Sequence, residues 1–484
     1  MTDADVLLSI VFVPTVGSVL LPLIGLVSPR LRNWLGLALV LVALVGSLSL
    51  APKVLGGHSI DFSHALNLVG VNFNLVLHAD GLAVFMAIVS SLVSSIIVLY
   101  SIGYISHYTN QNEYYAMVVL FLASMMGLVF SGNLILLYVF WELTAITSWR
   151  LIGFFREKSY VVRADKAFLV TMFGAVAMLL GFILIFNQTG TFDLAEIKAK
   201  LGGKALDSLA VALILMGILS KSATLPFHTW LPDAGVAPSP VTALLHAAVL
   251  VKIGVYVFAR LIIVNFAVSA GWHTAVLIIA AASTLVSAAA ALIDTDLKRI
   301  IAYSTISQIG FIFLGFAVSN EVGIAGALLY ILMHGIAKGG LFLCAGIVEQ
   351  NTHTKDITKM GGLIKTMPVT AIAFLFCAFS VMGIPPFGGF FSKFMVISGA
   401  VSGEQFWVSA VFIGGAFLTI IYLFRVFNLV FMGRPQLEPV KEGSPVMVFC
   451  VALLGAMSLV SGVLIAPSSS FAQQVAKQML GLSQ

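Results

Sequence analysis

Five ionisable side chains stand inside long apolar stretches of this chain of 484 residues. They are four lysines and one glutamate: Lys221, Lys252, Lys338, Lys393 and Glu142. An ionisable group at bilayer depth costs at least about 2.5 kcal/mol even on a permissive insertion scale. A chain that keeps five such groups is predicted to move charge, because intramembrane ionisable residues are typical of ion pathways.

Glu142 is the only acid in the interior of any predicted span, and Lys221 is its nearest predicted partner. A buried carboxylate and a buried ammonium are both expensive when left alone, so we expect them to pair. A pair that can separate changes the proton affinity of the lysine, which makes it a device for binding and releasing a proton. A fixed ion pair that only joins two helices is the alternative.

Two histidines precede lysines at short spacing, and histidine relays protons well near neutral pH. His334 lies four residues before Lys338, so the two share one face of a helix. His246 lies six residues before Lys252, off a common face unless a helical bulge or a water connects them. A hydrogen-bonded core histidine is the alternative for each. Neighbouring polar side chains that could hold water between the sites are Tyr330, Ser304, Thr305, Ser307 and Gln308.

The composition places these residues in a membrane. Hydrophobic residues make up 60% of the chain and charged residues 9%, with a mean hydropathy of +1.08. Soluble domains carry about 25% charged residues, so we predict an all-α polytopic membrane protein. The net charge of +5 falls mainly in loops, so it indicates no nucleic-acid partner. Three separated cysteines and the lack of a phosphate-binding fingerprint predict neither a metal nor a cofactor.

Apolar runs of about 20 residues predict roughly fourteen transmembrane helices. The first run has no basic residue before it, unlike a cleaved signal peptide, so it is expected to remain as a span. Of 25 Lys and Arg residues, fifteen fall in loops on one side of this topology and six on the other. The bias predicts that both termini lie on the outer side of an inner or plasma membrane. The predicted spans are 5–27, 34–51, 80–102, 114–131, 133–155, 165–187, 207–229, 239–262, 273–293, 298–318, 322–347, 367–399, 405–432 and 446–467.

Proline interrupts the seventh and the twelfth spans, and a lysine stands beside each interruption. Pro226 follows Lys221 by five residues, and Pro385 and Pro386 precede Lys393. Proline removes a backbone donor, so both helices are predicted to break. Unwound backbone at membrane depth is tolerated only in protein or beside a wet cavity. Paired broken helices that run in opposite directions are typical of transporters built from inverted repeats.

Several strings of the sequence resemble one membrane family over roughly residues 75–435. The strings are Phe140-Trp141-Glu142-Leu143, the run from Lys221 to Ala234, the run from Pro238 to Ala247, the run from Asp296 to Thr305, His334-Gly335-Ile336-Ala337-Lys338, and Gly383-Ile384-Pro385-Pro386 with Ser392-Lys393. The chain resembles the antiporter-like membrane subunits of respiratory complex I (NADH:quinone oxidoreductase). The same family includes large subunits of Mrp-type multisubunit cation/proton antiporters and of energy-converting membrane-bound hydrogenases.

The resemblance implies two inverted five-helix repeats and a hydrophilic axis in the membrane plane. Glu142 and Lys221 would form the first half-channel, Lys252 the connection and Lys393 the terminal site of the second. His334 and Lys338 would bridge the halves. The domains would be 1–110 (helices one to three), 111–265 (first repeat), 266–435 (second repeat) and 436–484 (helix fourteen and a short tail).

Two departures from the family pattern concern single residues, and one concerns the end of the chain. Ala175 stands where some relatives have an acid, and Arg150 replaces a usual apolar residue, where snorkelling or contact with a partner or lipid headgroup is expected. Longer relatives carry a C-terminal extension that includes a helix along the membrane. The chain is therefore not expected to be the strut-bearing distal subunit.

These observations predict a proton-translocating subunit of a larger membrane complex, without redox chemistry of its own. Its partners would be other membrane subunits, the lipid bilayer and protons, with Na⁺ as an open second ion. The alternative is a membrane partner that energises a peripheral protein in inorganic-carbon uptake. A scaffold with an idle polar axis is the third reading, which the cost of the retained lysines disfavours.

Overall fold

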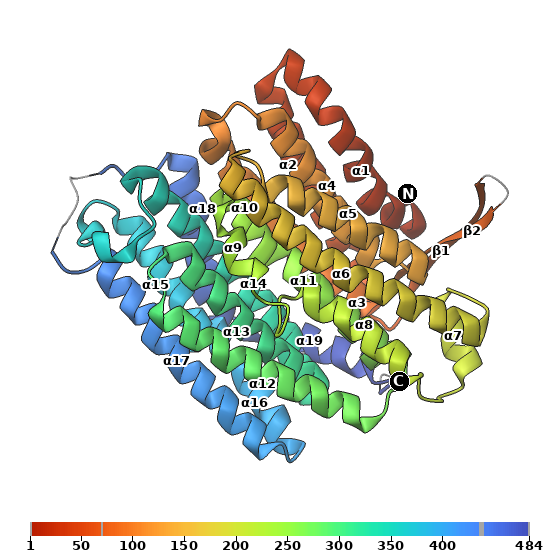
Figure 1. The fold of residues 1–484 in the computed structure, drawn as a ribbon. Coiled ribbons are helices and arrows are strands. Elements are labelled where there is room, and N and C mark those ends of the chain that lie inside the picture. The colour runs from red at the N-terminus through yellow and green to blue at the C-terminus, as the bar shows by residue number, and fades with distance from the viewer. Residues whose placement is uncertain (1, 69–70, 435–439, 483–484) are drawn as a thin grey trace.

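The computed structural model describes residues 2–68, 71–434 and 440–482, and it is nearly all helical. Within these residues, twelve helices are long and apolar enough to cross a bilayer, and two shorter apolar helices are α8 and α15. Figure 1 shows them as one bundle with largely aligned axes. The elements are α1 (Asp3–Val27), α2 (Pro29–Leu55), β1 (Ile60–Leu68), β2 (Val71–Ala79), α3 (Gly81–Tyr104), α4 (Gln111–Val129), α5 (Leu134–Ile152), α6 (Lys158–Thr189), α7 (Leu194–Leu201), α8 (Ser208–Lys221), α9 (Trp230–Asp233), α10 (Ser239–Ala243), α11 (Leu250–Phe258), α12 (Ala270–Ile293), α13 (Leu297–Ala317), α14 (Glu321–Thr352), α15 (Pro368–Met382), α16 (Gly388–Ser402), α17 (Phe406–Val430), α18 (Pro445–Val463) and α19 (Ile465–Met479).

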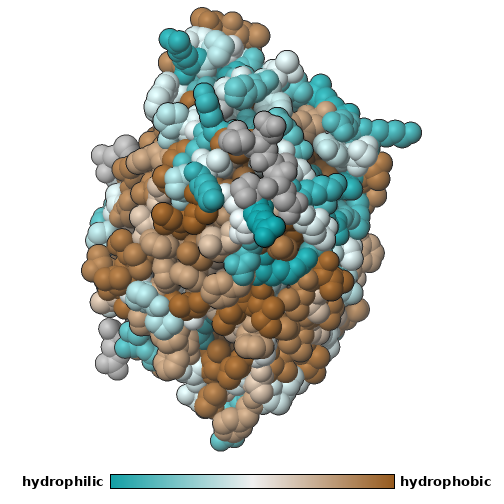
Figure 2. Space-filling view, turned by 90° about the vertical axis from the view of Figure 1, so that its left-hand side faces the viewer, coloured by the Kyte–Doolittle hydropathy of each residue, from teal (hydrophilic) through white to brown (hydrophobic). Residues whose placement is uncertain are grey.

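The outer surface of the bundle is apolar, as a lipid-facing surface must be. Val19, Leu23, Phe173 and Phe417 are between 57% and 67% exposed. On the face shown in Figure 2, hydrophobic residues cover the middle and lower part and hydrophilic residues gather toward the top. Because a soluble protein rarely exposes a large contiguous apolar surface, this pattern is that of a protein embedded in a bilayer.

Both ends of the chain lie at one end of the bundle, which we call the hairpin end because it also carries β1 and β2 (Figure 1). The start of α1 pairs with the end of α2 through Asp3 and Lys53. Gln478 in α19 donates to the carbonyl of Val54 in α2 at 2.6 Å. These contacts agree with the prediction that the two termini lie on the same side, and they say nothing of which side that is.

The sequence analysis missed three features at the hairpin end, a β-hairpin and two short helices. β1 and β2 pair antiparallel with Ile60 opposite Ala79, and α7 and α19 are short helices. The fold is therefore not purely α-helical. The hairpin is anchored because Gly132 donates its backbone N–H to Val76 at 2.9 Å and His78 donates to Phe130 at 2.7 Å. None of the three resembles a span, which is why a search for apolar runs passed over them.

Two of the membrane segments are broken where proline was expected to break them. α8 ends at Lys221, and the chain resumes helical structure at Trp230. α15 ends at Met382, and α16 begins at Gly388. A third irregularity lies between α10 and α11, where Leu244–Ala248 forms a π-helix. A helical bulge, one of the two features that could connect His246 to Lys252, is thus present.

Two loops at opposite ends of the bundle have the same construction. After α6, Thr189 donates to Thr191 O at 3.3 Å, and Asp193 pairs with Asn133 at the start of α5. After α14, Thr352 donates to Thr354 O at 3.3 Å, and Asp356 pairs with Asp296 at the start of α13. Both α6 and α14 have 32 residues. The pairs α5–α6 and α13–α14 are therefore closed by equivalent local structures.

Candidate functional site

Lys221 and Glu142 lie near each other without forming the predicted ion pair. Lys221 is fully buried, and its Nζ donates to the carbonyl of Trp141 at 3.1 Å and lies 5.1 Å from the centroid of the Trp141 ring. Both carboxylate oxygens of Glu142 are buried without a hydrogen-bond partner, and the ion pairs among the described residues do not include this one. The ammonium of Lys221 instead lies against Trp141, the residue before Glu142.

His246 and Lys252 face α14 from the irregular helix that contains the π-helical turn. Both ring nitrogens of buried His246 lack partners, and its ring lies 4.4 Å from that of Phe342, centroid to centroid. Nζ of Lys252 donates to the carbonyl of Ala247. A Cβ atom added at Gly335 would lie only 2.6 Å from this Nζ. The ammonium of Lys252 therefore lies against α14 at Gly335, the residue that follows His334.

His334 and Lys338 share a face of α14, as their spacing predicted. Both ring nitrogens of His334 are buried without a partner, and its ring packs edge-on against Tyr330 with centroids 5.9 Å apart. Nζ of Lys338 donates to the carbonyl of Ile301 at 3.1 Å and to Oγ of Ser304 at 2.5 Å. Lys338 is thus held by the first turns of α13.

A chain of buried hydrogen bonds leads away from Lys338, and we call it the α13–α17 chain. Tyr422 in α17 bonds Ser304 at 2.6 Å and Thr419 at 3.3 Å. Nε2 of Gln308 donates to Thr419 at 3.2 Å, and Oε1 of Gln308 accepts from the hydroxyl of Tyr330 at 2.5 Å. The members of the chain, Ser304, Tyr422, Thr419, Gln308 and Tyr330, are all buried.

Lys393 lies at the far end of this chain. It belongs to α16, and its Nζ donates to the carbonyl of Val381 at 2.7 Å, across the break in the helix. The same Nζ lies 5.6 Å from the ring centroid of Tyr330 and 4.5 Å from that of Phe311. Side chains from α13, α14, α16 and α17 therefore span the interval between Lys338 and Lys393.

The breaks expose their prolines and bury their lysines. Pro226, Pro385 and Pro386 are exposed, whereas Lys221 and Lys393 are buried. The break after α8 is held by Ser283, which accepts from the backbone N–H of Leu225 at 3.0 Å. Each broken segment thus presents its lysine to the interior of the bundle.

Single-sequence reasoning did not find Tyr422 and Thr419. The two residues stand three apart in α17, a mostly apolar helix, and are buried. Polar residues at this spacing often serve helix packing, so no signal separates them from packing residues. Their hydrogen bonds to α13 assign them to the chain.

Several buried polar atoms around these residues have no protein partner. Unpaired buried polar atoms cost free energy, and native proteins usually satisfy such atoms with ordered water. The described residues with such atoms near the lysines include Glu142, Trp141, Ser222, His246 and His334. We therefore expect water to enter this part of the bundle.

Asp80, which the sequence left ambiguous, belongs to an ion pair at the hairpin end. Its carboxylate accepts from Arg260 at 2.6 and 2.7 Å, and it also begins α3 by accepting from Ala83 N–H at 2.9 Å. Burial opposes ionisation of Asp80, but Arg260 and His78 together hold its pKa well below the usual range. Burial likewise disfavours protonated His78, whereas Asp80 and Asp61 raise the pKa of His78 above its ordinary value.

Arg150 pairs with Glu113 in α4, with Nε donating at 2.8 Å. The sequence analysis did not name this partner, an acid on the adjacent helix. A second strong pair joins Lys298 to Glu349 at 2.5 Å. Both pairs lie outside the row of buried lysines and tie helices together.

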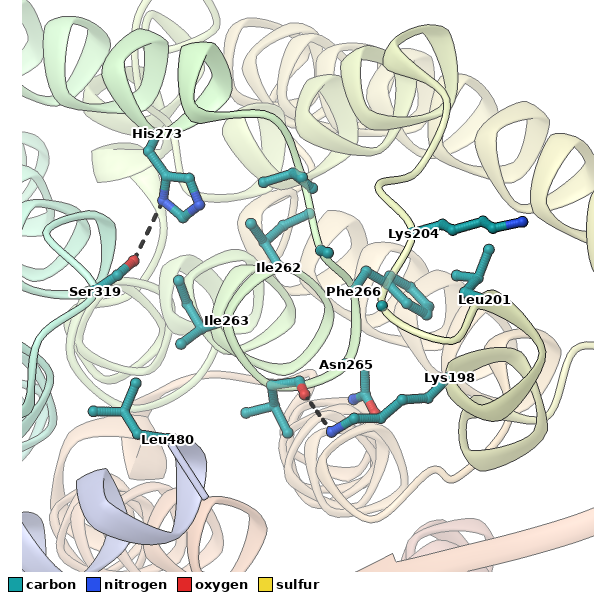
Figure 3. A pocket seen from close by; sticks show the side chains of 14 residues that line it. Lys198, Leu201, Lys204, Ile262, Ile263, Asn265, Phe266, His273, Ser319 and Leu480 are labelled. Atoms are coloured by element: carbon teal, nitrogen blue, oxygen red, sulfur yellow. Dashed lines mark hydrogen bonds between the residues drawn. The ribbon is translucent and has the colours of Figure 1, made fainter. Parts of the chain in front are cut away.

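The pocket in Figure 3 is separate from the buried lysines. It has a volume of about 390 Å³ and lies at the hairpin end between the loop after α7, the start of α12 and the C-terminal Leu480. Lys198 reaches into it and donates to the carbonyl of Val264 at 2.8 Å, and His273 contacts Ser319 at 3.3 Å. None of the predicted pathway residues lines it.

The fold and the buried side chains define a multi-pass membrane protein whose polar interior contains the four lysines that the sequence predicted. The chain belongs to the NADH:quinone oxidoreductase/Mrp antiporter transmembrane family, whose family model matches residues 131–419. A second family model, described as the N-terminus of chain 5 of NADH-ubiquinone oxidoreductase (complex I), matches residues 66–115. The resemblance read from the sequence is confirmed.

Named relatives are subunits of antiporters. The chain is 34% identical over 487 aligned residues to the Na(+)/H(+) antiporter subunit A1 of Staphylococcus haemolyticus, covering 93% of this chain and 60% of the relative. It is 32% identical to the subunit A1 of Staphylococcus aureus with the same coverage. The chain thus spans about 60% of the length of these relatives.

Two solved structures share the fold. A chain of the Mrp complex from Dietzia sp. DQ12-45-1b matches with a TM-score of 0.89 and 22% identity, covering 99% of this chain and 98% of that one. A chain of the archaeal membrane-bound sulfane sulfur reductase matches with a TM-score of 0.89 and 23% identity, covering 98% of each chain. At this level of identity the likeness extends to the fold alone.

Proposed function

We propose that the protein translocates protons through its row of buried basic residues, as a membrane subunit of a multisubunit antiporter or redox-driven complex. The observation that carries the proposal is the connection between Lys338 and Lys393. Five buried polar side chains bond in sequence from one ammonium to a ring that faces the other. Four of the five carry hydroxyls, which can both accept and release a proton.

The proposed route begins at Glu142 and Lys221, continues through Lys252, and reaches His334 and Lys338. His246 lies beside this route in the π-helical turn. Each lysine would bind a proton more or less tightly as its neighbours change charge, since close ionisable groups titrate together. The separation of Glu142 from Lys221 is the arrangement expected when the pair is open.

The domain boundaries are part of the proposal. Residues 111–265 and 266–435 would form two inverted repeats, with 1–110 before them and 436–484 after. The matching closures of α5–α6 and α13–α14 support this division, since they lie at opposite ends of the bundle. So does the pair of broken helices, one in each proposed repeat.

The orientation proposed is that the hairpin end faces the outside of an inner or plasma membrane. Five of the six basic residues assigned outside make contacts at the hairpin end: Lys53, Lys198, Lys200, Arg260 and Lys477. The larger set of basic residues would then face the inside, as loop charge requires. The relatives named Na(+)/H(+) antiporter subunit A1 support Na⁺ as the ion exchanged for protons.

The test measures proton movement in membrane vesicles that contain the assembled complex. Lys221→Ala and Glu142→Ala are expected to abolish Na⁺-driven or electron-transfer-driven proton movement while the complex still assembles. Lys204→Ala is the matched control, because Lys204 is exposed and far from the buried row. Wild-type proton movement in both buried-site variants would remove the proposed route.

A further inference from the structure

One member of the α13–α17 chain differs chemically from the others. Ser304, Tyr422, Thr419 and Tyr330 carry hydroxyls, whereas Gln308 carries a primary amide. The amide lies between Thr419, to which Nε2 donates at 3.2 Å, and Tyr330, from which Oε1 accepts at 2.5 Å. The amide of Gln308 therefore lies between Tyr330 on one side and Thr419, with its partner Tyr422, on the other.

A hydroxyl and an amide treat a proton differently. A hydroxyl oxygen can accept one proton on a lone pair and release its own, so it ends the step unchanged after rotation of its O–H bond. In a primary amide the nitrogen only donates and the oxygen only accepts. A proton passed from Tyr330 to Oε1, with one released from Nε2 to Thr419, leaves the imidic acid in place of the amide. Turning the amide end for end exchanges the two atoms and keeps the same restriction.

The packing around Gln308 keeps the amide in this position. The side chain is fully buried, and hydrogen bonds hold both of its ends. A third polar contact, from Nε2 to Oγ of Ser307, measures 3.5 Å. Leaving this position would break bonds in a buried site, where unpaired polar groups are costly.

We propose that Gln308 is a proton barrier between two relay segments. One segment runs from Lys338 through Ser304 and Tyr422 to Thr419, and the other is Tyr330 beside Lys393. Protons cross only when the amide moves aside and water bridges Thr419 to Tyr330. This inference rests on the proposed function, because a barrier has meaning only where protons travel.

A barrier at this point would prevent protons from leaking when the complex is idle. The lysines on both sides can then change charge in turn, and the crossing occurs only in the conformation that moves Gln308. Without the amide, water in its place could join the hydroxyl of Thr419 to that of Tyr330, whose ring faces Lys393. The barrier is placed at Gln308 because it is the one amide among the five members of the α13–α17 chain.

The experiment measures passive proton flux into liposomes that contain the assembled complex, under an imposed pH gradient and without a driving reaction. Gln308→Glu places a carboxyl, which can accept and donate through its two oxygens, in the same space. Passive flux is expected to rise at least about tenfold, equivalent to about 1.4 kcal/mol of barrier. Gln308→Ala is expected to raise the flux as well, since water can fill a polar gap of this kind. Gln308→Met fills the space with an apolar side chain and is expected to give no leak.

Two further sets of variants distinguish proton transfer along the α13–α17 chain from a leak caused by damaged packing. Adding Tyr330→Phe to Gln308→Glu or Gln308→Ala removes one hydroxyl and is expected to return the flux to the wild-type level, which packing damage would not do. Gln405→Glu makes the same chemical change at the start of α17, outside the chain, and is expected to leave the flux unchanged.

Three outcomes would overturn the proposed barrier. The first is no added flux in Gln308→Glu or Gln308→Ala, and the second is added flux that persists when Tyr330→Phe is combined with them. The third is a flux in Gln308→Met as high as in Gln308→Glu. In each case driven transport by the wild type would still stand. Failure of driven transport in the wild type would instead remove the proposed function.

Discussion

Gly335 allows the ammonium of Lys252 to lie against α14, and replacing it with alanine tests the position of that ammonium. A Cβ at residue 335 would lie 2.6 Å from Nζ of Lys252 and 3.3 Å from the carbonyl oxygen of Ala247. Ordinary nonbonded contacts are about 3.5 to 4.0 Å, so the ammonium must move by about 1 Å. That shift weakens its hydrogen bond to Ala247. A hydrogen bond from a charged group contributes about 1.5 to 3 kcal/mol.

The corresponding loss of proton transfer through Lys252 is about one to two orders of magnitude, if this step limits transport. Driven proton movement in vesicles measures it, with thermal unfolding as the check on folding. Gly339→Ala is the matched control one turn further along α14, because its Cβ would meet nothing closer than 3.4 Å. Both substitutions replace a helical glycine with alanine. That change by itself stabilises the helix by about 0.5 to 1 kcal/mol, equally in the two variants. Equal transport by the two variants would show that the position of Lys252 does not matter, and the reasoning would fail.

Two further predictions concern the α13–α17 chain and the hairpin end. Tyr422→Phe removes the hydroxyl that bonds Ser304 and Thr419. Driven proton movement is expected to fall, and the free energy of unfolding is expected to drop by about 1 to 2 kcal/mol. Unchanged proton movement would exclude Tyr422 from the route. His78 contacts two carboxylates, Asp61 of β1 and Asp80 before α3, and Asp80 in turn pairs with Arg260. Because the pKa of His78 is raised, its protonated form stabilises the folded hairpin end. That contribution is complete below the unfolded pKa of about 6.5 and is lost as the pH rises through the higher folded value, so hydrogen exchange in β2 should accelerate above about pH 6.5 beyond its chemical pH dependence. His78→Gln should remove this difference, and the exposed His64→Gln should retain it.

The membrane helices were predictable because the length and composition of an apolar run can be read directly along the sequence. An apolar run has to be long enough to cross the bilayer, and α12, α13 and α17 begin and end within a few residues of their predicted limits. Proline in an apolar run likewise marks a broken helix whatever surrounds it. The hairpin and α19 depend instead on contacts with distant parts of the chain, such as the bond from Gln478 to Val54, and no local pattern encodes these.

The candidate site was predictable to the extent that burial of charge is visible in sequence. All four lysines are buried in the structure, as the cost of exposing them to lipid requires. The geometry between them was not predictable. The predicted Glu142–Lys221 ion pair is not formed, and the ammonium of Lys221 donates to the backbone carbonyl of Trp141, a contact that residue types do not encode. Tyr422 joined the chain only because α17 packs beside α13, which no spacing reveals.

The two broken helices carry their lysines on opposite sides of the break, yet the ammonium of each donates to a backbone carbonyl. Ala223 and Gly383 both have positive φ, of 52° and 82°, and each stands three residues before a proline, Pro226 or Pro386. Counting back two residues from each gives Lys221 in one helix and Val381 in the other. The ammonium of Lys393 donates to the carbonyl of Val381 at 2.7 Å. If the proposed repeats are aligned on these breaks, the second half supplies from α16 the charge that the first half supplies from α8. A carbonyl freed by the break can accept that ammonium, so the position of the charge is set by the broken backbone and not by the residue number of the lysine.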